Sequence, residues 1–236
     1  MIQSIREGGD HMAYRPTEKT RAAKAQRRTA LLTEATRLVA EGGFAAATVK
    51  AIAERCQVSV GSVYSHFDGN ADLLASVFRA GADQELAAVR SAVAEAGSAA
   101  DRLRALVETF ALRAIRGRQL AWSLLFEPVD PRIDAERLTY RADYHALTTD
   151  ILRDGMESGE FPPQHLAVTA TALIGAISEA LTGRLSPTHA VATDTDDADT
   201  VDAILQFCLH GVGYVDTEPR STTAPVRPSP REGSDS

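Results

Sequence analysis

The chain has 236 residues, of which 44% are hydrophobic and 24% charged, and its formal net charge is −7. This length and apolar content suffice for one large domain or two modest ones with a buried core. Cys56 and Cys208 lie in apolar helical patterns without a paired spacing, which argues against a disulfide framework or a zinc ribbon. We expect no apolar run to supply the ~20 residues that span a bilayer, and therefore a cytoplasmic protein with no membrane partner.

The charge is distributed unevenly along the chain. Residues 1–70 carry 10 Lys and Arg against 7 Asp and Glu, a net +3, whereas the remaining residues carry 15 against 25, a net −10. Residues 13–30 contain a single acid, Glu18, and six basic residues: Arg15, Lys19, Arg21, Lys24, Arg27 and Arg28. Such a segment suits a phosphate backbone, although a solvated tail has the same composition. We expect a flexible basic arm over residues 1–23.

The two ends of the chain lack the periodicity of folded elements. Residues 7–10 precede a second methionine, Met12, and purine-rich codons for Glu-Gly-Gly would resemble a ribosome-binding site, so we expect translation to start naturally at Met12. Residues 217–236 are rich in Pro, Ser, Thr and Arg and have almost no large apolar side chains. Such a composition cannot bury enough surface to fold, so we expect a disordered tail there.

Between these ends, apolar residues recur at spacings of three and four, and no segment alternates as a strand would. Gly and Pro residues separate the periodic segments, because each interrupts a helix. We therefore predict an all-α protein with about nine helices. The predicted helices cover residues 24–42, 48–55, 59–66, 71–96, 99–116, 118–126, 132–157, 164–185 and 198–215.

The first three predicted helices have the spacing of a helix-turn-helix. The first ends at Gly42, and Thr48 and Ser59 stand at the N-cap positions of the next two. Val63 and Phe67 lie four residues apart and can anchor the third helix in a core. Two short helices around a tight turn present the second helix to the major groove. We predict a helix-turn-helix DNA-binding domain over residues 24–70.

This segment resembles the signature of the tetracycline-repressor (TetR) family. The resemblance rests on the run Thr48-Val49-x-x-Ile52-Ala53-x-x-x-x-Val58-Ser59-x-Gly61-Ser62-Val63-Tyr64-x-His66-Phe67. It implies a ligand-responsive regulator, most often a repressor, that binds a palindromic double-stranded operator as a dimer. A small, largely apolar effector would release it from DNA. The resemblance implies no catalytic residues, no cofactor and no metal site.

The resemblance also assigns DNA contacts to one group of residues. The expected contacts are Thr48, Lys50, Val60, Gly61, Ser62, Tyr64 and His66, and the basic segment before them adds Arg27 and Arg28. Thr48, Tyr64 and His66 would hold phosphates, whereas Val60 to Ser62 would lie against base edges, where Gly61 permits close approach. Outside this pattern, the tyrosine could be a packing aromatic and the histidine an ordinary surface residue.

Two positions depart from the family pattern. Gln57 occupies a turn position that is usually Gly, where a left-handed backbone would cost a non-Gly residue roughly 1 kcal/mol. Residues 68–72, which include Asn70, replace a loop that normally ends with a lysine beside a phosphate. We expect one backbone contact to be missing and DNA affinity to be weaker, unless the basic arm compensates.

Residues 71–216 form the second predicted domain, which the resemblance assigns to ligand binding and dimerisation. The helix near 71–96 would act as a lever between the two domains. The helix near 132–157 is apolar or aromatic on more than one side, so we expect it at the centre of the domain. The expected ligand-binding residues are Phe110, Trp122, Phe126, Tyr140, Arg141, Tyr144, His145, Ile174 and Glu179. Simple packing in the core is the alternative for each of them.

The helices near 164–185 and 198–215 are expected to form the homodimer, because their stripes pair small with large apolar residues. Packing within one domain is the alternative.

Two other function classes remain open: an enzyme built on a helical bundle, and an interaction protein with a vestigial DNA-binding head. The chain has no Glu-x-x-His pair, nucleophile elbow or Walker loop, which disfavours the enzyme.

Overall fold

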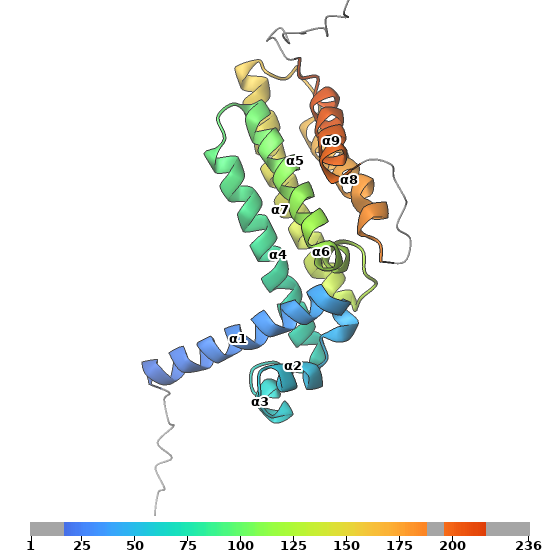
Figure 1. The fold of residues 1–236 in the computed structure, drawn as a ribbon. Coiled ribbons are helices and arrows are strands. Elements are labelled where there is room, and N and C mark those ends of the chain that lie inside the picture. The colour runs from blue at the N-terminus through green and yellow to red at the C-terminus, as the bar shows by residue number, and fades with distance from the viewer. Residues whose placement is uncertain (1–16, 188–195, 216–236) are drawn as a thin grey trace, which may run out of the picture.

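The computed structural model describes residues 17–187 and 196–215 (Figure 1). These residues contain helices and no strand, which confirms the predicted all-α class. The elements are α1 (Glu18–Gly42), the short 3₁₀ helix η1 (Phe44–Ala46), α2 (Val49–Arg55), α3 (Val60–Tyr64), α4 (Asn70–Glu95), α5 (Ala99–Arg116), α6 (Arg118–Leu125), α7 (Pro131–Ser158), α8 (Leu166–Leu185) and α9 (Asp197–Gly211).

The largest difference from the predicted boundaries is at the start of α1. The helix begins at Glu18 instead of residue 24, because the Thr17 hydroxyl accepts a hydrogen bond from the amide of Thr20 at 3.3 Å and caps it. Residues 18–23, expected in the flexible arm, are therefore helical. The rest of that arm, Met12 and the expected tail over 217–236 lie outside the described residues.

Residues 18–82 form a head at one end of the molecule. In Figure 1, α1 crosses the first turns of α4, and α2 and α3 lie beneath it. Their common core is apolar and includes Leu31, Val39, Ile52, Val63, Phe67 and Leu73. The head core also contains Phe78 and Ala82 from the third turn of α4 and beyond, so it extends past the predicted boundary at residue 70.

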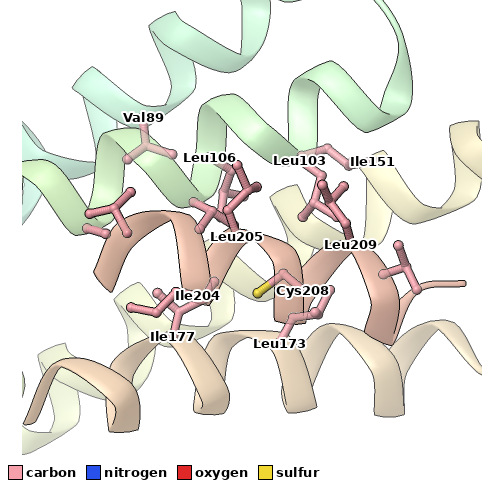
Figure 2. Close-up of a cluster of buried hydrophobic side chains, with 14 of the residues drawn as sticks. Val89, Leu103, Leu106, Ile151, Leu173, Ile177, Ile204, Leu205, Cys208 and Leu209 are labelled. Atoms are coloured by element: carbon pink, nitrogen blue, oxygen red, sulfur yellow. The ribbon is translucent and has the colours of Figure 1, made fainter. Parts of the chain in front are cut away.

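The other long helices run alongside one another and bury a second core. Figure 2 shows α9 placed between α5 and α8, with Leu205 facing Leu106 of α5, and Cys208 and Ile204 facing α8. Cys208 is fully buried, and burial raises the pKa of its thiol to about 11. It is therefore a core residue, as its apolar setting in the sequence predicts. Cys56 is half-buried.

Helix α8 corrects one expectation. By length and composition it is apolar enough to cross a membrane, whereas the sequence was expected to contain no such run. Only 22% of its most apolar window is buried within this chain. A helix that lies in an interface between soluble subunits passes the same test.

The turn between α2 and α3 has the backbone conformation that the sequence suggested. Gln57 has a φ of 55°, and it is the one non-glycine residue with positive φ in the described part of the chain. The amide of Val58 donates to the carbonyl of Ala53 at 2.9 Å, which closes the turn. The strained residue is therefore fixed by the pairing of its neighbours.

We expect Gln57→Gly to raise the free energy of unfolding by up to about 1 kcal/mol, because glycine adopts this φ without a clash but adds freedom to the unfolded chain. Equilibrium urea unfolding at one protein concentration measures the change. Gln57→Ala keeps the strained φ and is the matched control, expected within ~0.5 kcal/mol of the unmodified protein. A glycine variant no more stable than the alanine variant would contradict this explanation.

Candidate DNA-binding head and effector cavities

The N-caps of α2 and α3 set the geometry of the helix-turn-helix. The Thr48 hydroxyl accepts a hydrogen bond from the amide of Ala51 at 3.1 Å, and the Ser59 hydroxyl accepts one from the amide of Ser62 at 3.1 Å. Both predicted caps are confirmed. They fix where each short helix begins, and so which face of α3 is turned outward.

Helix α3 is anchored on one side and open on the other. Val63 and Phe67 are buried, whereas Val60 and Tyr64 are 44% and 49% exposed. Exposed apolar and aromatic side chains that lie four residues apart on one helix face form a contiguous patch, which is typical of a contact surface. With the exposed Gly61 between them, these residues present a surface on which the edge of a DNA groove could rest.

The remaining expected DNA contacts surround this surface. Lys50 on α2 is exposed and lies 3.9 Å from Glu54, too far for a strong ion pair. His66 is half-buried, and its Nδ1 has no hydrogen-bond partner in the described part of the chain. Burial lowers the pKa of His66, and so do the charges of Lys24, Arg27 and Arg28 on α1. The end of α3 thus lies in the positive field of α1.

The two arginines of α1 that are expected to contact DNA differ in their surroundings. Arg27 is exposed. Arg28 is half-buried: its Nη2 donates to the Ser76 hydroxyl at 3.0 Å, and its guanidinium lies 4.8 Å from the centre of the Phe67 ring. Arg28 therefore makes contacts within the head that Arg27 does not make.

The loop before α4 is held by an internal hydrogen bond and a glycine with positive φ. The amide of Asp68 donates to the Asp72 carboxylate at 3.1 Å, and Gly69 has a φ of 96°. Asn70 is the first residue of α4 and is exposed. This loop offers a carboxylate where a lysine would attract a phosphate, so its local charge does not favour DNA.

An inner cavity of about 100 Å³ lies between α4, α5, α6 and α7. Four expected ligand-binding residues line it: Phe110, Tyr140, Arg141 and Tyr144. The Phe110 and Tyr144 rings meet edge to face, with centroids 5.5 Å apart. Burial raises the pKa of the Tyr144 phenol, and the nearby Glu85 carboxylate adds to the effect, so this phenol is uncharged.

An outer cavity of about 500 Å³ lies between α7 and α8. It is lined by five expected residues, Phe126, Arg141, His145, Ile174 and Glu179. The predicted set is thus divided between two cavities, and Arg141 lines both. Trp122 lines neither; its ring packs against Phe126 with centroids 5.4 Å apart.

The charged groups of the inner cavity differ in whether they are already paired. Arg113 binds the Glu85 carboxylate through two hydrogen bonds of 2.5 and 2.9 Å. Arg137 donates to the backbone carbonyls of Leu124 at 2.9 Å and Glu127 at 3.0 Å. No hydrogen bond or ion pair engages Arg141 in the described ranges. Arg141 is therefore the cation in this wall that remains available to a bound molecule.

A contact that the sequence did not reveal joins the head to the cavity domain. Both carboxylate oxygens of Glu127, just after α6, accept from the amide of Phe44 at 3.1 Å. Gly43 has a φ of 74°, and a Cβ there would lie 2.8 Å from a Glu127 oxygen. The glycine thus makes room for the carboxylate. The partners are 83 residues apart, so no local pattern could have indicated the pair.

Comparison with known proteins agrees with this arrangement. Residues 31–77 match the family model described as bacterial regulatory proteins of the tetR family, and residues 96–182 match the tetracyclin repressor-like C-terminal domain. The HTH-type transcriptional repressor KstR2 of Rhodococcus jostii (strain RHA1) is 31% identical over 150 residues, which are 62% of this chain and 72% of that protein.

Two solved structures share the fold. The transcriptional regulator FadR from Bacillus subtilis, in complex with stearoyl-CoA, matches with a TM-score of 0.66 at 19% identity. The match covers 78% of this chain and 98% of the FadR chain. AibR in complex with isovaleryl coenzyme A and operator DNA matches with a TM-score of 0.60 at 20% identity, over 77% of this chain and 97% of the AibR chain. The matching domains and the 31% identical repressor show that this chain belongs to the TetR family of bacterial transcriptional regulators.

Proposed function

We propose that this protein is a cytoplasmic repressor that binds a palindromic operator as a homodimer and leaves it when a small molecule occupies the inner cavity. The observation that carries this proposal is the exposed face of α3 beside the positive charge of α1, on a head packed against the wall of that cavity. Family membership favours a regulator over an enzyme, and over an interaction protein with a vestigial DNA-binding head.

Apolar surface on α8 and α9 supports the homodimer. Val168 on α8 and Phe207 on α9 are each 62% exposed, and most of the apolar window of α8 is not buried within the chain. A second copy related by a two-fold axis would cover the same patch on both subunits. The same symmetry would present two α3 helices to the two halves of a palindrome.

The effector we propose combines an apolar group with an anionic part. The inner cavity is lined mainly by apolar side chains, and a cavity of about 150 Å³ is enough to hold benzene, so a group of a few carbons fits here. Arg141 stands between this cavity and the larger outer one, where its charge can meet an anion. Acyl thioesters of coenzyme A, which FadR and AibR bind, have this form.

DNA binding tests the repressor directly. We expect the protein to bind a duplex from upstream of its own coding sequence at least about 10³-fold more tightly than a shuffled duplex at physiological salt, with two protomers per site. Fluorescence anisotropy gives both affinities. Tyr64→Ala should weaken specific binding about tenfold, whereas Leu138→Ala, which removes an exposed side chain on α7, should not. Equal affinity for the two duplexes would contradict a repressor.

The effector is tested separately with isovaleryl-CoA and stearoyl-CoA, followed by the fluorescence of the single tryptophan, Trp122. We expect Arg141→Gln to weaken binding about tenfold, because it removes a charge-assisted hydrogen bond. Arg153→Gln is the matched control, since Arg153 lies on the same helix, pairs with Asp150 and lines neither cavity. The proposed effector class is wrong if neither ester binds, or if the two variants bind equally well.

A further inference from the structure

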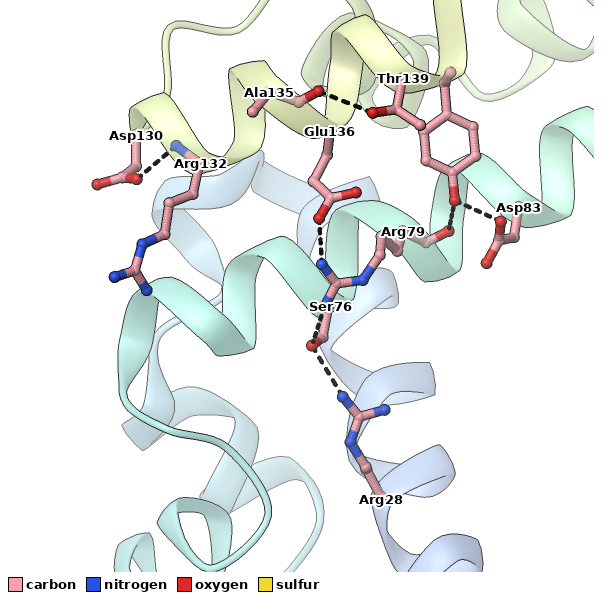
Figure 3. Close-up of polar contacts among 10 residues, drawn as sticks. Arg28, Ser76, Arg79, Asp83, Asp130, Arg132, Ala135, Glu136 and Thr139 are labelled. Atoms are coloured by element: carbon pink, nitrogen blue, oxygen red, sulfur yellow. Dashed lines mark hydrogen bonds and ion pairs between the residues drawn. The ribbon is translucent and has the colours of Figure 1, made fainter. Parts of the chain in front are cut away.

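A buried hydroxyl joins two guanidinium groups where the head meets α4. Figure 3 shows Arg28 from α1 and Arg79 from α4 converging on Ser76. Each donates through Nη2 to the Ser76 Oγ at 3.0 Å, and Ser76 is only 3% exposed. A hydroxyl oxygen has two acceptor positions, and both are occupied here. No pattern in the sequence singles out Ser76.

Arg28 continues this network toward the DNA-binding surface. Its guanidinium lies over the ring of Phe67, which is buried and follows α3 by three residues. A cation over an aromatic face is attracted to the ring, and the planar guanidinium fits this stacking better than a lysine would. Arg28 thus holds α4, through Ser76, and the end of α3, through Phe67, in one arrangement.

Arg79 continues the network in the other direction, toward the inner cavity. It forms an ion pair with Glu136 on α7 (Figure 3). One turn further along α7, the Tyr140 phenol donates to Asp83 and to the backbone carbonyl of Arg79. Tyr140 lines the inner cavity. The contacts therefore run without a gap from the cavity wall to Phe67, three residues after α3.

We propose that Arg28 and Ser76 are positioning residues for operator binding, and that Arg28 is not a phosphate contact. This inference rests on the proposed function. It revises the role that the charge of the basic segment suggested for Arg28, because each of its contacts here is internal, and leaving them for a phosphate would strip the buried Ser76 of a partner. Arg27, the next residue, is exposed and keeps the expected role.

The salt dependence of DNA binding separates the two roles. Plotted against log salt concentration, log K falls with a slope whose magnitude is about 0.9 for each phosphate contact. Removing one such contact from each of two protomers therefore reduces the magnitude of the slope by about 1.8. We expect Arg28→Gln and Ser76→Ala each to weaken binding to the upstream duplex about tenfold with the slope unchanged. The matched variant Arg27→Gln should reduce the magnitude of the slope. Combining Arg28→Gln with Ser76→Ala should add little to either change alone.

A charge-conserving variant provides the second test. Arg28→Lys retains the positive charge but loses the planar fork and the stacking on Phe67, so we expect nearly the same loss of affinity as for Arg28→Gln. Arg27→Lys should bind as the unmodified protein does. Circular dichroism and the melting temperature of each variant show whether the head remains folded.

Several outcomes would overturn the proposal. A smaller salt dependence for Arg28→Gln would show that Arg28 contacts a phosphate. Full affinity for Arg28→Lys or for Ser76→Ala would show that the network through Ser76 does not position the head. Failure of the proposed function gives a different result, because the unmodified protein itself would then not bind the upstream duplex specifically.

Discussion

Three buried side chains belong at once to the core of the head and to the wall of the inner cavity: Phe78 and Ala82 on α4, and Leu124 on α6. Protein interiors are packed to crystal-like density, so a shared wall cannot admit a group larger than the existing cavity without moving some of its atoms. A molecule larger than this cavity therefore presses on residues that also hold the head. Under the proposed function, this shared packing couples the cavity to the head.

Polar contacts determine which direction such a displacement takes. Apolar packing supplies most of the favourable free energy but is not directional, whereas hydrogen bonds and ion pairs require defined geometry. The Glu127 carboxylate ties the end of α6 to the amide of Phe44, and Arg79 ties α4 to Glu136 on α7. Helices α6 and α7, which line the cavity, thus each have a polar attachment near the head. Under the proposed function, these attachments would transmit a shift of either helix to α1, α2 and α3.

The sequence predicted the local features well and the long-range polar contacts poorly. Thr48 and Ser59 were identifiable as caps, and Gln57 as a left-handed turn residue, because short-range backbone geometry restricts each residue type. Helical periodicity placed Tyr144 on an inward face, but it could not divide the expected ligand residues between two cavities. It could not show that Arg28 turns inward either, since a basic residue in a basic run gives no sign of its partner.

The separation of the two α3 helices in the proposed dimer tests the central claim most directly. Spin labels at Ser65→Cys, in a Cys56→Ala background, report this distance by pulsed electron resonance. The account predicts a narrow distribution compatible with half-sites ~34–36 Å apart when the operator is bound. It also predicts a shifted distribution in free Ala114→Leu, whose added side-chain atoms occupy the inner cavity from α5 and would press on the shared wall. Identical distributions for free Ala114→Leu and free protein with Ala114 would contradict coupling between cavity and head.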